Sequence, residues 1–353
     1  MTVDIGIASL TDLRPRTVDG RDRTAEERIS QITALAELAD REGLDHVGIG
    51  EHHNPEFVVS SPAVVLAAVA ARTTRVRLTS SVSTLSALDP VRLHEDFATL
   101  DLISSGRAEL TVGRSAYPEP FALFGYDIDD YEALFEEKLD LLLRLRATER
   151  VTWRGRFRSP LADAAVVPRP VQPVLPVWLG VGGTPTSAAR AGLLGLPMIL
   201  GYIGGGVDHL ARLADVYREA GDRAGYGDRL RLGVAVHYFG AATTREALET
   251  YPHYHDFLRP KRPGGGGFTV GPEQFRAGLE PGRHLMIGTS EHVAGKLVDL
   301  VDRLRVDRVQ ALVDWGGLPE RQVEESVTRL AREIAPLVRA HVARGGQRSS
   351  TAT

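Results

Sequence analysis

Hydrophobic and polar positions along the chain form a repeating order of short and long segments. Short runs rich in β-branched residues indicate buried strands, and longer stretches with apolar residues three and four apart indicate amphipathic helices. The pair recurs about eight times, which predicts a parallel sheet with crossover helices. The expected strands are Val3–Ala8, Asp45–Gly50, Val76–Ser81, Arg107–Val112, Val177–Val181, Pro197–Leu200, Leu232–Phe239 and Val309–Val313.

The helices expected between these strands carry recognisable start signals. Thr24 stands three residues before Glu27, which is the spacing of a capping box. Pro62 and Pro90 stand at first helical turns, where a missing amide hydrogen costs nothing. The helix that Pro90 opens runs to 103. Further helices are expected over 129–145 and 319–342, and two more are expected to begin at Thr184 and at Ser290.

Two segments break this alternation. Residues 151–173, after the fourth strand and its helix, are rich in proline and predict a hairpin-like insertion. Residues 242–285, after the seventh strand, include the glycine run 264–267 and are expected to form a lid or an irregular excursion. One domain is expected over 1–344, followed by a flexible tail over 345–353, because the tail is small and polar.

Eight strand–helix units with two insertions predict a (β/α)8 TIM barrel, a fold that takes about 250 residues before insertions. A doubly wound open sheet is the alternative, because periodicity counts strands without showing whether the sheet closes. In either fold the side chains at the carboxyl ends of the strands face the ligand site.

Candidate chemistry gathers at the end of the second expected strand, where Glu51, His52 and His53 follow one another. Histidine suits proton transfer because its ordinary pKa lies near neutrality. Adjacent side chains on extended backbone point to opposite faces, so one of the two histidines is expected to be structural. A histidine that only caps a loop is the alternative for each.

A second group of candidates follows the fourth and fifth expected strands. The stretch from Gly180 to Ser187 is rich in glycine, and Thr184 and Pro185 open a helix whose free amides favour an anion. A phosphate site and an ordinary tight turn are both consistent with this stretch. Arg114 could clamp a phosphate, or it could pair with a nearby glutamate at the surface.

Composition narrows the class of protein. With 43% hydrophobic and 25% charged residues and a net charge of -4, the chain is typical of a globular protein with a large core. It contains no cysteine, which excludes disulfides, thiol nucleophiles and cysteine-ligated metals. No basic stripe, leader or apolar run of membrane length is found, so a cytoplasmic protein without nucleic-acid or membrane partners is expected.

Several motifs together resemble the bacterial luciferase-like flavin-dependent monooxygenase family, in its FMN branch. The resemblance keeps the family's order over almost the whole chain. Its motifs are Glu51–His53, the turn 80–84 with Asp89–Arg92 after it, the run Leu100–Arg107, Phe124–Asp127, and the segments 187–198 and 287–293.

This resemblance implies an oxidoreductase that uses reduced FMN and molecular oxygen on a small organic substrate. Such enzymes are usually homodimers and often receive reduced FMN from a separate flavin reductase. His52 matches the catalytic histidine, and Glu51 is expected either to orient His52 or to stabilise the loop from the core of the turn. Ser81 and Val82 match a pair joined by a cis peptide under the flavin ring. The implied cofactor contacts, of which Arg114, Thr184 and Ser187 would hold the phosphate, are Ser81, Val82, Gly113, Arg114, Val181, Gly182, Gly183, Thr184 and Ser187.

Some questions stay open at this point. Gly113 and the pair Gly182–Gly183 depart from the light-emitting members, which puts light emission and a long-chain aldehyde substrate in doubt. A deazaflavin-dependent dehydrogenase and a non-catalytic flavin-binding protein are alternatives, although retention of His52 argues against the latter. A metal hydrolase is disfavoured and no metal is expected, since adjacent histidines chelate one ion poorly; its ligands would be Glu51, His52, His53 and His237.

Overall fold

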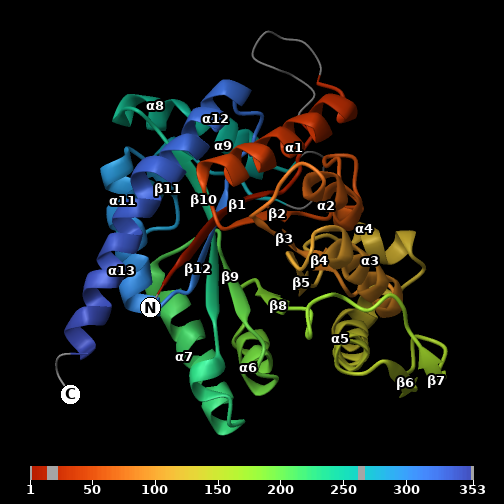
Figure 1. Ribbon diagram of the computed structural model, residues 1–353. Coiled ribbons are helices and arrows are strands. Elements are labelled where there is room, and N and C mark those ends of the chain that lie inside the picture. Colours follow the sequence, from red (N-terminus) through yellow and green to blue (C-terminus); the bar gives the residue numbers. More distant parts are fainter. Residues whose placement is uncertain (1, 14–22, 261–266, 351–353) are drawn as a thin grey trace.

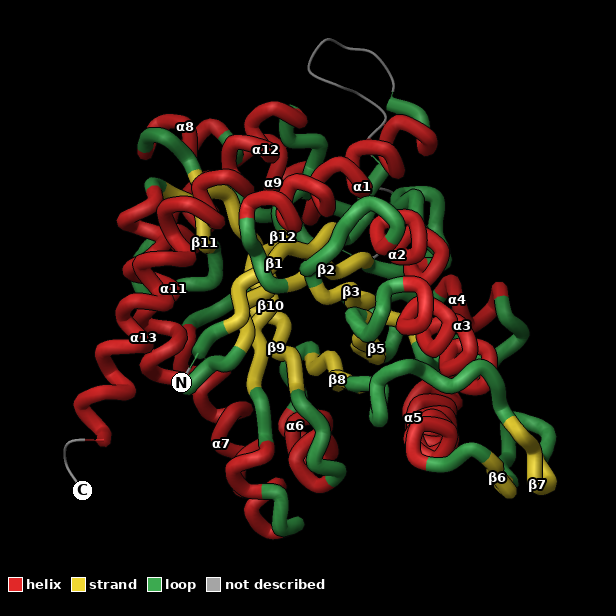
Figure 2. The backbone as a smooth tube through the Cα atoms, viewed as in Figure 1, coloured by secondary structure: helices red, strands yellow, loops and turns green. Residues whose placement is uncertain are grey.

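The parallel strands at the centre of the molecule close into a barrel, and the helices lie outside it (Figures 1 and 2). The computed structural model describes residues 2–13, 23–260 and 267–350. Closure is visible at the last strand, where Arg308 lies opposite Asp4 on one side and Gly233 on the other. The predicted TIM barrel is therefore confirmed, and the open sheet is excluded.

The barrel strands lie within two residues of their predicted ends. They are β1 (Asp4–Ser9), β2 (His46–Ile49), β3 (Arg77–Ser80), β5 (Ala108–Gly113), β8 (Val177–Val181), β9 (Met198–Tyr202), β10 (Leu232–Gly240) and β12 (Arg308–Leu312). The outer helices are α1 (Ala25–Glu42), α2 (Pro62–Ala70), α3 (Pro90–Ile103), α5 (Tyr131–Ala147), α6 (Pro185–Leu193), α7 (Val207–Arg223), α11 (Ser290–Leu304), α12 (Glu320–Arg329) and α13 (Ala335–Ser350). Short elements are β4 (Ser83–Thr84), α4 (Glu119–Leu123), the 3-10 turns η1 (Ile128–Asp130) and η2 (Gly227–Arg229), and a π-helical turn η3 (Leu330–Ile334).

The helix starts follow from their capping residues. The Thr24 hydroxyl accepts a hydrogen bond from the Glu27 amide at 3.1 Å, and the Glu27 carboxylate accepts one from the Thr24 amide at 2.9 Å. This is the predicted capping box. Asp89 caps α3 in a similar way, since its carboxylate accepts from the amide of Val91 at 2.9 Å.

The two insertions differ in how well the sequence predicts them. The first is the predicted hairpin, with β6 (Arg150–Trp153) antiparallel to β7 (Leu161–Ala165). The second insertion is not the irregular segment that was one of the two expectations. It contains three helices, α8 (Thr244–Glu249), α9 (Tyr251–Leu258) and α10 (Pro272–Leu279), and is followed by a strand, β11 (Met286–Gly288), which is parallel to β10.

The second insertion is ordered because it buries aromatic side chains against the barrel. Tyr254 of α9 and Phe275 of α10 are 0% and 1% exposed. Residues 261–266, which hold most of the predicted glycine run, lie outside the described residues. At the carboxyl terminus, α13 continues to Ser350 through part of the predicted tail, and 351–353 also lie outside.

The amino end of the barrel is built for stability. Arg308 is buried and pairs with Glu109 and Asp4, and its guanidinium lies 4.3 Å from the ring centre of Trp178. Burial alone would raise the pKa of Glu109, but Arg308 and Arg77 lower it to about 2. Charges are satisfied within this end, so the opposite, carboxyl end is where ligand chemistry is expected.

Candidate active site

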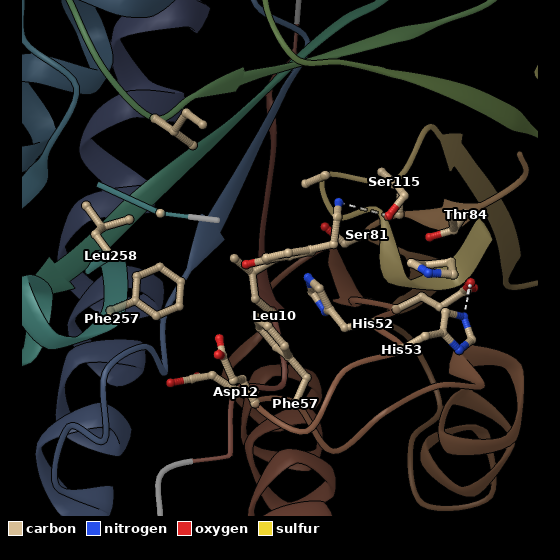
Figure 3. Close-up of a pocket in the computed structure, with 18 of the residues that line it drawn as sticks. Leu10, Asp12, His52, His53, Phe57, Ser81, Thr84, Ser115, Phe257 and Leu258 are labelled. Carbon is tan, nitrogen blue, oxygen red and sulfur yellow. Dashed lines mark hydrogen bonds and ion pairs between the residues drawn. The ribbon is translucent and has the colours of Figure 1, made fainter. Parts of the chain in front are cut away.

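A cavity of about 380 Å³ opens at the carboxyl end of the barrel (Figure 3). One wall carries His52 and His53 after β2 with Ser81 after β3, and Phe257 and Leu258 of α9 lie across the cavity from His52. The cavity is lined mainly by apolar and aromatic side chains, the usual character of a small-molecule site. These include Leu10, Phe57, Val82, Tyr117, Pro120, Ile203, Phe257, Leu258 and Phe268.

Within the Glu51–His53 segment, Glu51 and His53 pair with each other, and His52 makes separate contacts. The side chains of Glu51 and His53 are 1% and 5% exposed, and the His53 Nε2 lies 2.9 Å from the Glu51 Oε1. Of the two roles expected for Glu51, the structure therefore favours stabilising the loop over orienting His52, because residues two apart on extended backbone share a face and residues one apart do not. His53 also meets the ring of Phe124 edge to face at 4.9 Å, so its position is fixed from two sides.

His52 is held by aromatic packing. Its ring stacks on Phe57 with centroids 3.6 Å apart and planes 10° apart, and it meets Tyr117 edge to face at 5.8 Å. Its Nδ1 is buried without a hydrogen-bond partner among the described residues. His52 is thus a fixed imidazole that lines the cavity, with its Nδ1 covered by protein atoms.

Burial, with a smaller contribution from the neighbouring His53, lowers the pKa of His52 to about 3, although a hydrogen bond with the Leu10 backbone acts in the opposite direction. The imidazole is therefore neutral at physiological pH. The expected pKa near neutrality is wrong, because sequence does not reveal how completely aromatic neighbours would remove water from this ring.

The floor of the cavity contains the peptide bond between Ser81 and Val82, which is cis, as the resemblance implies. The Ser81 hydroxyl donates to the Gln310 side-chain oxygen at 3.0 Å inside the barrel. Gly113 does not reach the cavity wall: a Cβ there would lie 2.7 Å from the Val82 Cγ2. Its absent side chain makes room for Val82, which itself faces the cavity.

The predicted phosphate residues meet beside the cavity. Arg114 lines the cavity, and its guanidinium donates to the Ser187 hydroxyl at 2.9 Å. Thr184 is the N-cap residue of α6 as expected, but its hydroxyl donates to the same Ser187 oxygen at 2.8 Å and makes no capping bond to a backbone amide. Arg114 also forms an ion pair with Glu132 of α5. The pairing with a glutamate is therefore confirmed, and the phosphate clamp stays a prediction for a guanidinium that lines the cavity.

The glycine-rich turn before α6 lies next to this group rather than at the cavity itself. Val181 is buried at the end of β8, and none of Val181, Gly182 and Gly183 lines the cavity. Gly183 has a φ of 128°, a conformation that L side chains rarely adopt, and a Cβ on Gly182 would meet only open space. The turn leaves the backbone beside Ser187 uncovered, which suits the approach of an anion.

Several residues of the cavity were missed by sequence reasoning. Asp12 follows β1, and its Oδ1 lies 3.7 Å from the buried guanidinium of Arg28, which also pairs with Asp314 at 2.7 Å. A polar residue after the first strand was an available signal for Asp12. The α9 residues Phe257 and Leu258 had none, because an insertion's docking on the barrel is not encoded in local periodicity.

The structure also bears on the metal-hydrolase alternative and on membrane-spanning helices. In the described part of the chain, no group of three or more histidine, cysteine, aspartate or glutamate side chains has an arrangement that could hold a metal ion. His237, the distant ligand of the hydrolase alternative, lies instead 3.1 Å from the hydroxyl of Tyr254 through its Nδ1. Among the described helices, none is long and apolar enough to cross a membrane.

The structure combines a closed (β/α)8 barrel, a mainly apolar cavity at its carboxyl end with histidines on its wall, and an arginine–serine–threonine group beside that cavity. The sequence profile of the luciferase-like monooxygenases matches residues 3–308. The chain therefore belongs to the luciferase-like monooxygenase family, and the resemblance noted from its motifs is confirmed.

Its relatives are monooxygenases and other oxidoreductases. The chain is 27% identical over 317 residues to N-acetyl-S-alkylcysteine monooxygenase of Bacillus subtilis, covering 88% of this chain and 86% of that protein. It is 35% identical over 172 residues to F420-dependent glucose-6-phosphate dehydrogenase of Kineococcus radiotolerans, covering 46% of this chain and 50% of that protein.

A solved structure shares the fold. The oxygenating constituent of 3,6-diketocamphane monooxygenase from Pseudomonas putida, a type II Baeyer-Villiger monooxygenase in complex with FMN, superposes with a TM-score of 0.76 at 20% identity. The match covers 95% of this chain and 98% of that chain. The family thus includes enzymes that use FMN and enzymes that use F420.

Proposed function

We propose that the protein is an FMN-dependent monooxygenase that uses reduced FMN and molecular oxygen to oxidise a small organic substrate. The observation that carries the proposal is the position of Arg114. It lines the cavity that holds His52 and also bonds to Ser187, which bonds to Thr184. A ligand with a phosphate at one end and a flat apolar body would engage both places.

The donor set fits such a cofactor. A guanidinium and two hydroxyls at the start of α6 suit a phosphate, since charge-assisted hydrogen bonds and a helix amino terminus both favour an anion. The cavity above the cis peptide is bordered by Val82 and aromatic side chains, which suits a flat ring. His52 also lines the cavity, and its Nδ1 is buried without a hydrogen-bond partner among the described residues.

Reduced FMN, when bound, would supply the electrons with which oxygen is activated. The protein's own part is to bind, to exclude water and to handle protons. Arg114, Thr184 and Ser187 hold the phosphate, and Phe57 and Tyr117 keep the cavity dry around His52. His52 is neutral and lines the cavity, so its imidazole can accept a proton or a hydrogen bond there, while Glu51 holds His53 in place.

A deazaflavin-dependent dehydrogenase is the second candidate, because the identity with the F420-dependent glucose-6-phosphate dehydrogenase reaches 35% over 172 residues. Competition binding separates the two. If the first proposal holds, the protein should quench FMN fluorescence, and F420 at a concentration equal to that of FMN should restore little of that fluorescence. Preferential binding of F420 would contradict it and support the dehydrogenase.

We also propose that the enzyme is a homodimer that receives reduced FMN from a separate reductase. The surface over α2 and α3 supports the dimer, because Val64, Ile103 and Val167 are exposed around one groove. Sedimentation should give a dimer for the wild type and a monomer for Val64→Glu. A monomeric wild type at micromolar concentration would contradict this assignment.

A further inference from the structure

A second histidine faces the cavity and has no role in the proposed chemistry so far. His237 lies on β10, is 2% exposed and lines the same cavity as His52. Its ring meets Phe257 edge to face at 5.6 Å and Tyr254 at 5.3 Å. The imidazole is therefore clamped in one orientation between α9 and the barrel.

The hydroxyl of Tyr254 determines which nitrogen of His237 carries the proton. Tyr254 is fully buried, and its hydroxyl has the His237 Nδ1, at 3.1 Å, as its one hydrogen-bond partner among the described residues. A buried O–H without an acceptor is costly, so the tyrosine donates and the Nδ1 accepts. A neutral imidazole then carries its proton on Nε2.

The ring is neutral at physiological pH. Burial, with a smaller contribution from His284, lowers the pKa of His237 to about 3, while burial raises the pKa of the Tyr254 hydroxyl. Both groups thus keep the protonation states that the hydrogen bond requires.

The Nε2 of His237 has no partner within the described part of the chain and is not sealed off by protein atoms. Because the residue lines the cavity, this N–H is open to the ligand space. Phe257, Leu258 and Phe268 line the same cavity, and so does Arg259, whose guanidinium is paired with Asp256. A fixed donor among these apolar side chains selects a ligand atom with a lone pair at one place.

We propose that His237 is a substrate-positioning residue, which donates its Nε2–H to an oxygen acceptor of the organic substrate and is held in that tautomer by Tyr254. The inference rests on the proposed monooxygenase function, because it assigns this wall to the substrate and the Arg114 end to the cofactor. The substrate it fits is a neutral, mostly apolar molecule with a carbonyl, ether or hydroxyl oxygen.

The tautomer is tested first, by two-bond 1H–15N correlation spectra of protein labelled with 15N-histidine. His237 should show the pattern of the Nε2–H tautomer at pH 7, and Tyr254→Phe should produce a mixture of tautomers. An Nδ1–H tautomer in the wild type would overturn the proposal. This measurement needs no flavin, so it stands apart from the cofactor assignment.

Substrate positioning is tested with cyclohexanone and methylenecyclohexane, which have similar shapes but differ in the oxygen acceptor, on protein saturated with oxidised FMN. Cyclohexanone should bind more tightly and shift the His237 Nε2–H signal. His237→Phe should weaken cyclohexanone binding roughly tenfold to a hundredfold, as expected for one hydrogen bond to a buried donor, and His237→Gln should restore part of it. Methylenecyclohexane should bind all three proteins alike.

His255→Gln is the matched control, because His255 also bonds through its Nδ1, to the Val270 carbonyl, and does not line the cavity. It should leave both probes unaffected. Equal loss of both probes in His237→Phe would overturn the proposal in favour of a packing role. Weaker FMN binding in His237→Phe with unchanged cyclohexanone binding would overturn it in favour of a cofactor contact. Failure of the wild type to bind FMN would instead strike the proposed function.

Discussion

Replacing Arg114 by alanine should weaken FMN binding and leave riboflavin binding nearly unchanged. The side chain is 18% exposed, lines the cavity and donates to Ser187, so it is the one cavity-lining guanidinium that reaches the proposed phosphate group. Riboflavin has the same ring system without the phosphate. The difference between the two ligands therefore isolates what Arg114 contributes.

The magnitude follows from two opposing contributions. A charged hydrogen bond to a phosphate is worth about 1.5–3 kcal/mol. Arg114 must give up part of its ion pair with Glu132, whose side chain is 56% exposed, and such surface pairs are worth about 0.2–1 kcal/mol. The net loss should be about 1–2.5 kcal/mol, which corresponds to roughly 5- to 60-fold in Kd.

Equilibrium titration by flavin fluorescence measures this loss. Arg190→Ala is a matched control, because Arg190 is 15% exposed, pairs with Glu136 and also approaches Glu132, but does not line the cavity. It should change FMN binding less than about twofold, within the range for surface charges. Glu132→Gln frees Arg114 and should tighten FMN binding up to about fivefold. Equal affinity of the wild type for FMN and riboflavin would refute the phosphate assignment.

Three further results are expected. His52→Ala should bind FMN nearly as well as the wild type but lose roughly 10²–10⁴-fold in turnover, and His53→Ala should have a smaller effect. A wild-type rate for His52→Ala, measured with the true substrate and an external flavin reductase, would show that His52 takes no part in the mechanism. The pKa of His237 is lowered to about 3 in the folded protein, so between pH 3 and 6.5 the unfolded chain binds more protons than the folded one. The contribution of His237 to the free energy of unfolding should therefore be fully present above pH 6.5 and be lost as the pH falls towards 3. His237→Phe should reduce that slope by up to about 1.4 kcal/mol per pH unit in urea titrations, and an unchanged slope would show that the ring is not buried in neutral form. Hydrogen exchange should find α9 protected with and without FMN, since Tyr254 is fully buried. The amide of Gly267 at the cavity should slow only with ligand, and rapid exchange across α9 in the free protein would contradict the packing described.

The barrel itself was predictable because its signals are local. Each strand is a buried apolar run, and residues such as Thr24 and Asp89 mark helix starts through bonds to amides only two or three residues away. Sequence periodicity could not show closure, which depends on pairing between Asp4 and Arg308, 304 residues apart.

The site was predictable where it follows strand ends and not where it depends on packing. Arg114, Thr184 and Ser187 meet as the resemblance implied. The neutral state of His52 could not be foreseen, because it arises from the stacking of Phe57 across the cavity wall. The bond between His237 and Tyr254 was equally hidden, since it depends on where the second insertion docks.

The claim that matters most is that the protein binds reduced FMN and directs its reaction with oxygen. The most direct measurement is an anaerobic titration with reduced FMN, followed by mixing with oxygenated buffer in a stopped-flow spectrometer, with reduced F420 in parallel. The account predicts binding of reduced FMN that weakens in Arg114→Ala, and a transient absorbance that matches neither reduced nor oxidised free FMN. Binding of reduced F420 without binding of reduced FMN would contradict it.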